Sequence, residues 1–318
     1  MNYRDNIDNN YNLKNLTKCK ELIKLNKFEF MDKGVQGEVF KVHSKYCGSV
    51  VIKKKLLREQ DLKYKNAKTW LKKQLKEEYL IMKITNTLIN KFICPNFIKV
   101  YDFDDNIGLI IMEYANGDSK FLFANGKLFS TEIYKSFLFQ VMISIYYYNN
   151  ALKLTHKDSR LQNILYKKIN PNTIFHYKIN NIDYYVPTYG YLFMLADFGA
   201  VHPLEFNDIE IFNFSIFVNY VNALYPLYKE KMKLTHQEEE IFNLIIEKKE
   251  FFDNNLFKQY KQTMIQKLSK VNEIMNNYIF EIDTILTSDK NILEIFKTYF
   301  LEYSVNVYDK KNIINFSN

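Results

Sequence analysis

Short alternating runs of apolar and polar residues fill much of the first 115 positions, and glycines fall between them. Such runs, bounded by turn-forming residues, are typical of β-strands. Three strands are predicted first, at about 27–33, 37–45 and 48–55, and two more at 97–103 and 108–114. Between these groups, apolar residues recur every third or fourth position from about 68 to 85, which predicts one long helix.

The pattern becomes helical after residue 130. Ser130 is a suitable N-cap, and Ile133, Phe137, Val141 and Ile145 repeat at every fourth residue along one face. Further helices are predicted at about 14–25, 209–225, 237–249, 256–280 and 289–302. A strand-rich half followed by a helical half indicates an α+β fold with two lobes.

The length of 318 residues also suits two lobes. We therefore expect an N-terminal extension over 1–25, a small β-rich lobe with one long helix over 26–115, and a larger, mainly helical lobe over 116–318.

Composition and charge narrow the class of protein. The longest apolar runs, such as 191–196, are far shorter than a membrane span, and the first 20 residues lack the apolar segment of a signal peptide. The three cysteines are widely spaced, which fits a soluble intracellular protein better than a disulfide framework. The net charge of +8 is densest at 53–55 and 72–73. We assign these lysines to catalysis and to a solvated helix face, so we expect no nucleic-acid partner.

Two short segments carry the candidate chemistry. In the first, Asp158 lies two residues after His156 and is followed by Arg160 and Asn163; the second is Asp-Phe-Gly, beginning at Asp197. Asp158 can accept or orient the proton of an attacking hydroxyl, and Arg160 can offset charge on a transferred phosphoryl group. Asn163 and Asp197 offer the oxygen ligands that Mg²⁺ prefers. A lone Asp or Asn in a loop is usually a turn residue, but this order and spacing favour a phosphoryl-transfer site.

Lys53 ends an apolar strand segment and shares a strand face with Val51. We expect its ammonium group to point into a nucleotide cleft and to reach the α- and β-phosphates. A lysine in this position needs an acidic partner, and the helix predicted at 68–85 offers two. Glu78 falls near the apolar stripe of that helix, where a carboxylate is costly unless it is paired, so Glu78 is the predicted partner and Glu77 the solvated alternative.

The remaining candidates would contact a nucleotide. Gly34 and Gly37 lie between the first two predicted strands, where small residues let backbone amides close over a triphosphate, although an ordinary β-hairpin is the alternative. Val39 would cover the adenine ring, and Val51, on the face of Lys53, is a further nucleotide-binding candidate. At the end of the fifth predicted strand, Met112 would limit the back of the pocket, and the backbone of Glu113 and Ala115 would bond adenine. An ordinary core strand is the alternative there.

Together with the Cys-Pro-Asn-Phe-Ile segment at 94–98, these motifs resemble the eukaryotic-type protein kinases over roughly 27–225. Composition and the divergent glycine loop are also similar to kinases of large DNA viruses. The resemblance implies a two-lobed protein-kinase fold, ATP and Mg²⁺ as cofactors, and protein substrates with Ser or Thr hydroxyls. For a viral member it implies the host cytoplasm or the virion as the location.

Several departures from the family pattern are visible. Asp32 replaces the first glycine of the loop, and Arg160 stands where serine/threonine kinases usually have lysine. We interpret 167–191 as an insertion that forms a strand extension or a hairpin. The Ala-Pro-Glu motif is missing, and a helix is predicted to start near Asp208, which makes the activation segment very short.

The leading hypothesis is thus an ATP- and Mg²⁺-dependent serine/threonine protein kinase. A small-molecule kinase of the aminoglycoside or choline kinase type is the first alternative, because those enzymes also lack an ordinary activation segment. A pseudokinase acting as an interaction module is the second, although all the catalytic positions carry competent residues. Arg160 also leaves tyrosine open as the acceptor, and the sequence does not predict the oligomeric state.

Overall fold

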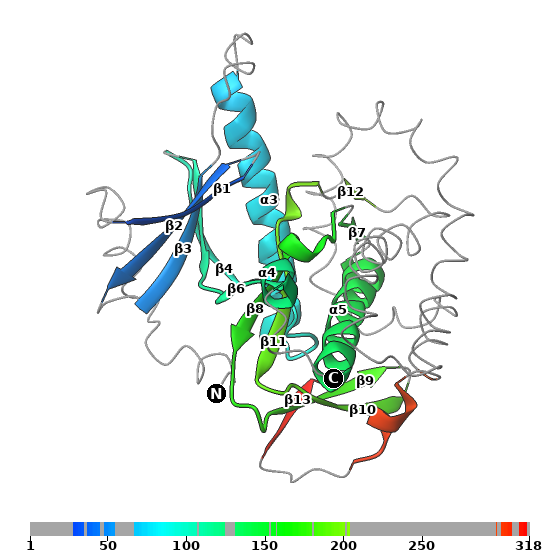
Figure 1. Cartoon of the computed structure of the whole chain (residues 1–318). Coiled ribbons are helices and arrows are strands. Elements are labelled where there is room, and N and C mark those ends of the chain that lie inside the picture. Colours follow the sequence, from blue (N-terminus) through cyan, green and yellow to red (C-terminus); the bar gives the residue numbers. More distant parts are fainter. Residues whose placement is uncertain are drawn as a thin grey trace. The chain divides into compact units, whose positions relative to one another are not determined.

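The computed structural model of the chain describes the following residues: 28–34, 37–44, 48–54, 67–106, 108–124, 131–152, 154–156, 158–179, 181–200, 202–203, 297, 300–306 and 312–316. They fall into two compact units (Figure 1). The first unit holds the described residues up to Asn90 together with Ile98–Ala115, and the second holds Lys91–Phe97 and those from Asn116 onward. The helices predicted at 14–25, 209–225, 237–249 and 256–280 lie outside the described residues.

The first unit contains an antiparallel sheet with the strand order β1-β2-β3-β5-β4. The strands are β1 (Glu29–Gly34), β2 (Gly37–Ser44), β3 (Gly48–Lys54), β4 (Val100–Asp104) and β5 (Leu109–Glu113). Four of the five begin and end within two residues of the predicted bounds. The exception is β4, which begins three residues late because the backbone turns at 95–97, where the Phe97 amide bonds the Pro95 carbonyl.

The register separates two sets of side chains on this sheet. Residues that pair directly, or that lie two apart in one strand, share a face. Val39 pairs with Lys53, and Val51 pairs with Met112, so these four predicted site residues lie on one face. The buried apolar cluster on the opposite face consists of Val42, Val50, Ile52, Leu109 and Ile111. That cluster is the core that holds the strands in register.

The long helix α3 (Ala67–Asn90) belongs to the same unit. Its buried residues Leu75, Glu78 and Met82 follow the spacing of one helix face. Near the end of the helix, the Asn86 amide donates to the Val100 carbonyl at 2.6 Å and accepts from the Val100 amide at 3.1 Å. This two-way bond fixes α3 against the start of β4.

The second unit has more strands among its described residues than a mainly helical lobe suggests. Its helices are α4 (Ser119–Ala124) and α5 (Thr131–Leu152), with short 3₁₀ turns at Leu161–Asn163, Phe198–Ala200 and Leu301–Ser304. Its strands are β6 (Gly117–Asp118), β7 (Leu154–Thr155), β8 (Ile164–Lys168), β9 (Ile174–Ile179), β10 (Ile182–Pro187), β11 (Tyr191–Leu195), β12 (His202–Pro203) and β13 (Ile313–Phe316). They form three small sheets with the orders β11-β8-β6, β10-β9-β13 and β12-β7.

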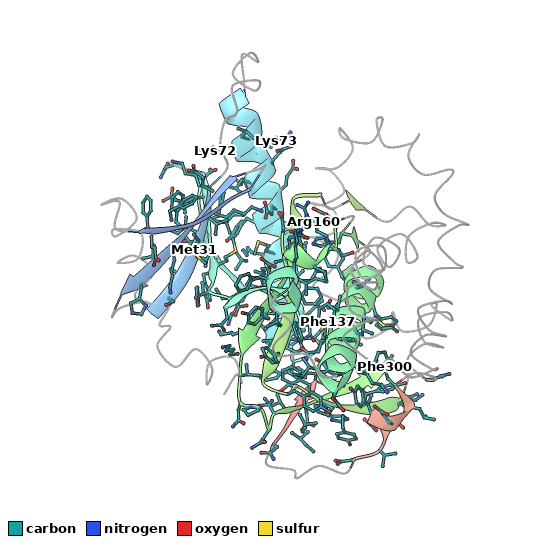
Figure 2. All side chains as sticks on the ribbon, in the orientation of Figure 1. Met31, Lys72, Lys73, Phe137, Arg160 and Phe300 are labelled. Carbon is teal, nitrogen blue, oxygen red and sulfur yellow. The ribbon has the colours of Figure 1, made fainter. Side chains whose placement is uncertain are left out.

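Helix α5 is the centre of this unit. All its residues from 136 to 148 are buried, and such a helix is enclosed by other elements on every side. Phe139 contacts the rings of Tyr177, Tyr184, Phe300 and Tyr303, with centroids 4.9 to 5.8 Å away. Figure 2 labels Phe137 and Phe300 in this aromatic core. Despite its apolar character, α5 does not qualify as a membrane span, and neither does any other described helix.

The segment 167–191 contains the hairpin that its sequence predicted, formed by β9 and β10. Strand β13, from near the end of the chain, pairs with β9 in parallel (Figure 1). The segment and the end of the chain therefore form one sheet.

Candidate active site

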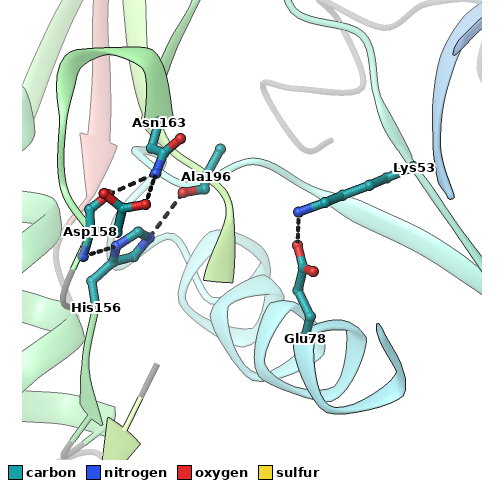
Figure 3. Close-up of polar contacts among 6 residues, drawn as sticks. All are labelled: Lys53, Glu78, His156, Asp158, Asn163 and Ala196. Atoms are coloured by element: carbon teal, nitrogen blue, oxygen red, sulfur yellow. Dashed lines mark hydrogen bonds and ion pairs between the residues drawn. The ribbon is translucent and has the colours of Figure 1, made fainter. Parts of the chain in front are cut away.

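Lys53 and Glu78 form a buried ion pair in the first unit (Figure 3). The Lys53 Nζ atom lies 2.6 Å from Glu78 Oε1, and the two side chains are 11% and 1% exposed. Glu77, the alternative partner, is only half-buried. The predicted choice between the two glutamates is confirmed, because Glu78 shares the buried face of α3 with Leu75 and Met82. The pair fixes where the lysine ammonium lies.

The residues predicted to contact a nucleotide all lie on the sheet of the first unit or directly after it. Gly34 ends β1 and pairs with Gly37 at the start of β2. Val51 and Met112 are buried next to each other on the Lys53 face, Val39 is half-buried there, and Ala115 is buried just after β5. This face thus combines apolar side chains with one anchored cation, which suits an aromatic base linked to phosphates.

Glu113 has a role that the sequence did not predict. Its Oε1 atom accepts from the Lys99 amide at 2.5 Å, and its own amide donates to the Lys99 carbonyl at 2.9 Å. The buried Glu113 side chain therefore holds the chain just before β4. Any bond from Glu113 to adenine would have to come from its carbonyl group.

In the second unit, His156 holds the catalytic segment to the strand that leads to Asp197. Its ring is buried, and the Nε2 atom lies 2.9 Å from the carbonyl oxygen of Ala196 (Figure 3). The Nδ1 atom accepts a hydrogen bond from the Asp158 amide at 3.3 Å. Since a carbonyl only accepts, Nε2 carries the proton and the ring is neutral. The histidine thus fixes the backbone of Asp158 relative to residue 196.

The Asp158 carboxylate is held by two neighbours. Asn163 Nδ2 donates to the Asp158 carbonyl at 2.8 Å and to Asp158 Oδ2 at 2.9 Å. Arg160 Nε lies 3.3 Å from Asp158 Oδ1. This second contact is an ion pair without hydrogen-bond geometry, since Nε has no hydrogen-bond partner among the described residues. The side chain of Asp158 is therefore oriented on both of its oxygens.

Asp197 has an unusual backbone. Its φ angle is +61°, in the left-handed region that residues other than glycine rarely adopt. Such conformations persist where the surroundings impose them, and they are common at functional sites. Here the preceding residue, Ala196, donates to the Asn163 carbonyl and accepts from His156, so it is fixed on both sides.

The pKa of the Asp158 carboxyl depends on the charge of Asp197. Burial raises the pKa of the Asp158 carboxyl above 3.8, and the nearby Asp197 charge raises it further. Arg160 and the Asn163 hydrogen bond act in the opposite direction and lower this pKa, and the net shift is upward. Asp158 and Asp197 are thus close enough to repel each other, which a cation between them and a polyanionic substrate would offset.

These residues suit Mg²⁺ better than a metal held by protein ligands alone. Asn163 Nδ2 donates to Asp158, which leaves Asn163 Oδ1 as the atom of this side chain that could bind a metal ion, together with the Asp197 carboxylate. No group of three or more His, Cys, Asp or Glu side chains in the described residues could hold a metal. A Mg²⁺ ion typically takes one or two protein ligands and completes its octahedral shell with water and phosphate oxygens.

The aromatic support behind the site was not predicted from the sequence. The Tyr148 ring on α5 lies 6.1 Å from the His156 ring and 5.6 Å from the Phe198 ring, and the last two are 5.1 Å apart. The aromatic run at 146–148 was a visible signal, but periodicity cannot tell which ring faces the catalytic segments when the whole helix is buried.

The chain is similar to known proteins. The family model described as protein kinase domain matches residues 25–221. A relative called probable serine/threonine-protein kinase 380R, from Invertebrate iridescent virus 6, is 25% identical over 176 residues. The match covers 49% of this chain but only 33% of the viral protein, so the chain spans about a third of that relative's length.

Proposed function

Because the chain belongs to the protein kinase family, we propose that it transfers the γ-phosphoryl group of ATP to Ser or Thr hydroxyls of proteins with Mg²⁺ bound. The anchoring of the Asp158 carboxylate, by Asn163 on one oxygen and Arg160 on the other, carries this proposal. A phosphoryl-transfer enzyme gains most of its rate enhancement from positioning the reactants and stabilising charge in the transition state. Around the Asp158 carboxylate, Asn163 supplies a positioning hydrogen bond and Arg160 supplies a positive charge. The name of the viral relative supports serine or threonine as the acceptor.

Asp158 would orient the substrate hydroxyl and take its proton. As the hydroxyl oxygen bonds to the γ-phosphorus, the bond from that phosphorus to the bridging oxygen breaks, and ADP leaves with the electron pair. Arg160, 40% exposed, is able to reach the transferred group and offset its charge. Mg²⁺ held by Asn163 and Asp197 would supply neutralisation of the phosphate oxygens.

The first unit would bind and orient ATP. Lys53, fixed by Glu78, would bond the α- and β-phosphate oxygens, and the amides around Gly34 and Gly37 would cover the triphosphate. The adenine ring would pack between Val39, Val51 and Met112, and it would bond the backbone of Glu113 and Ala115. The buried ion pair between Lys53 and Glu78 would thus fix the position of the cation that bonds the phosphates.

A substrate panel tests the proposal. The purified chain is incubated with ATP labelled at the γ-position, Mg²⁺, and either casein or myelin basic protein, in parallel with aminoglycosides and choline. We expect label in protein, and none with the variant Asp158→Asn. Label only in a small molecule would establish the small-molecule kinase, which the short stretch between Asp197 and Asp208 favours. No ATP turnover with any acceptor would establish a pseudokinase.

A further inference from the structure

Strand β11 leads directly to Asp197, and among the described strands it pairs with β8 alone. At its other edge, one backbone bridge between Phe97 and Leu195 and two side chains take the place of a neighbouring strand. Gln140 accepts from the Phe193 amide at 2.9 Å and donates to the Tyr191 carbonyl at 3.1 Å. The Asn96 side chain donates through Nδ2 to the Phe193 carbonyl at 2.9 Å, and the backbone carbonyl of Asn96 accepts from the Leu195 amide at 2.9 Å. The position of β11 therefore depends on these two fully buried amides.

Asn96 is oriented in turn by the hairpin. The Tyr177 hydroxyl on β9 donates to Asn96 Oδ1 at 2.7 Å, and Asn96 Nδ2 also donates to Gln140 at 3.0 Å. With the oxygen bound by Tyr177, the amide nitrogen faces β11. A hydroxyl in the segment 167–191 therefore orients this amide together with the Cys94 thiol, whose Sγ lies 3.6 Å from the same oxygen.

The Tyr177 ring is held by the end of the chain. Phe316 of β13 lies opposite Tyr177 in the parallel register, and the two rings stack with centroids 5.5 Å and planes 25° apart. Phe316 is only 1% exposed. On its other side, the Tyr177 ring packs against Phe139 of α5 at 5.5 Å. Removing Phe316 would leave one flank of the tyrosine ring without its neighbour.

We propose that Tyr177, held by the strand β13, is a positioning residue for Asp197. A series of contacts runs from Phe316 through Tyr177 and the Asn96 side chain to the Phe193 carbonyl on β11, four residues before Asp197. Since β11 ends at Leu195, two residues before Asp197, a displacement of this strand would displace the Asp197 side chain. Displacements of about 1 Å at such a group weaken transition-state contacts strongly. The inference rests on the metal-binding role proposed above for Asp197.

The test measures binding of ATP by calorimetry, with and without Mg²⁺, in the full chain. The variants are Tyr177→Phe, which removes only the hydroxyl, Phe316→Ala, and the double variant. Tyr185→Phe is the matched control, since it removes a hydroxyl from the outer face of the same hairpin, where Tyr185 stacks on His176.

We expect Tyr177→Phe to weaken binding of ATP in the presence of Mg²⁺ by about three- to tenfold, as for loss of one buried hydrogen bond. Binding without Mg²⁺ should stay within about twofold, because general loss of structure would weaken both but misplacement of Asp197 weakens only the metal-dependent part. The double variant should be no worse than the worse single one. Tyr185→Phe should match the parent.

Equal binding by Tyr177→Phe and the parent in the presence of Mg²⁺ would overturn the inference, and so would equal losses with and without Mg²⁺. Either result overturns the inference provided that the parent chain binds ATP more tightly with Mg²⁺ than without it. A parent with no such difference would contradict the proposed function itself, so the two failures are distinguishable. If Phe316→Ala does not fold, Tyr177→Phe alone decides.

Discussion

Lys53 Nζ and Glu78 Oε1 lie 2.6 Å apart in a buried position, although 24 residues of the sequence separate Lys53 from Glu78. Removing two charges from water is costly, and such a pair stabilises a fold less than apolar residues of the same size often would. Its presence in the first unit is therefore better explained by a need for a fixed cation than by stability.

The ion pair leads to a prediction about coupling. Lys53→Met and Glu78→Gln should each lower kcat/KM by about 10²-fold, because the cation that orients the phosphates is lost or misplaced. The double variant should be little worse than the worse single variant. Glu77→Gln is the matched control and should differ from the parent by less than about twofold. Additive losses in the double variant would show that the two residues act independently.

The catalytic segments predict different defects for the two aspartates. Asp158→Asn should lower kcat by about 10²- to 10⁴-fold while ATP still binds, because it removes the proton acceptor. Asp197→Asn should weaken the binding of ATP with Mg²⁺ as well, because it removes a metal ligand. Asparagine tolerates a positive φ better than alanine, so Asp197→Asn keeps the fold more safely than Asp197→Ala. Turnover near the parent's for either variant would contradict the assigned roles.

The raised pKa of Asp158 predicts the pH dependence of activity. Only the ionised carboxylate accepts a proton, so kcat/KM should fall on the acid side around a pKa above 3.8. Arg160 lowers this pKa and Asp197 raises it. Arg160→Gln should therefore move the acid limb of the profile to higher pH, and Asp197→Asn should move it to lower pH. An acid limb that stays at the parent's pH in both variants would contradict the assignment.

The same shift predicts a stability change. The folded chain protonates Asp158 at higher pH than the unfolded chain does, so the contribution of this carboxyl to stability is complete below its unfolded pKa. It is lost as the pH rises through the raised pKa. As the pH rises through this range, the free energy of unfolding of Asp158→Asn should therefore increase relative to that of the parent chain. Urea titration at several pH values measures both.

Gln140 predicts a large loss of stability. Gln140→Leu would leave the Phe193 amide and the Tyr191 carbonyl buried without their partner, at a cost of about 3 to 5 kcal/mol in the free energy of unfolding. Ser144→Ala on the same helix is the control, because among the described residues the Ser144 hydroxyl donates to the Val141 carbonyl alone, within α5. It should cost no more than about 1 kcal/mol.

Local pattern predicted much of the first unit. Alternation located the strands to within a few residues, and the phase of one apolar stripe was enough to prefer Glu78 over Glu77. The end of α3 was predicted five residues too early, at about 85, whereas the helix continues to Asn90. The Thr85 hydroxyl bonds the Met82 carbonyl within the helix.

Contacts between residues far apart in the chain could not be predicted from the sequence pattern. The bonds of Asn96 join it to positions that are 44 to 97 residues away along the chain, and no periodicity contains that information. The hydrogen bond that the Glu113 side chain accepts comes likewise from a distant residue, Lys99, which lies just before β4. The short segment after Asp197 was predicted from spacing, and most of it lies outside the described residues.

The most direct test is phosphoamino-acid analysis of a protein substrate labelled by the purified chain from γ-labelled ATP and Mg²⁺. The proposed function predicts label on phosphoserine or phosphothreonine, its loss with Asp158→Asn, and its loss when Mg²⁺ is chelated. Label on phosphotyrosine alone would contradict the proposed acceptor, and equal label from Asp158→Asn and the parent would contradict the proposed site.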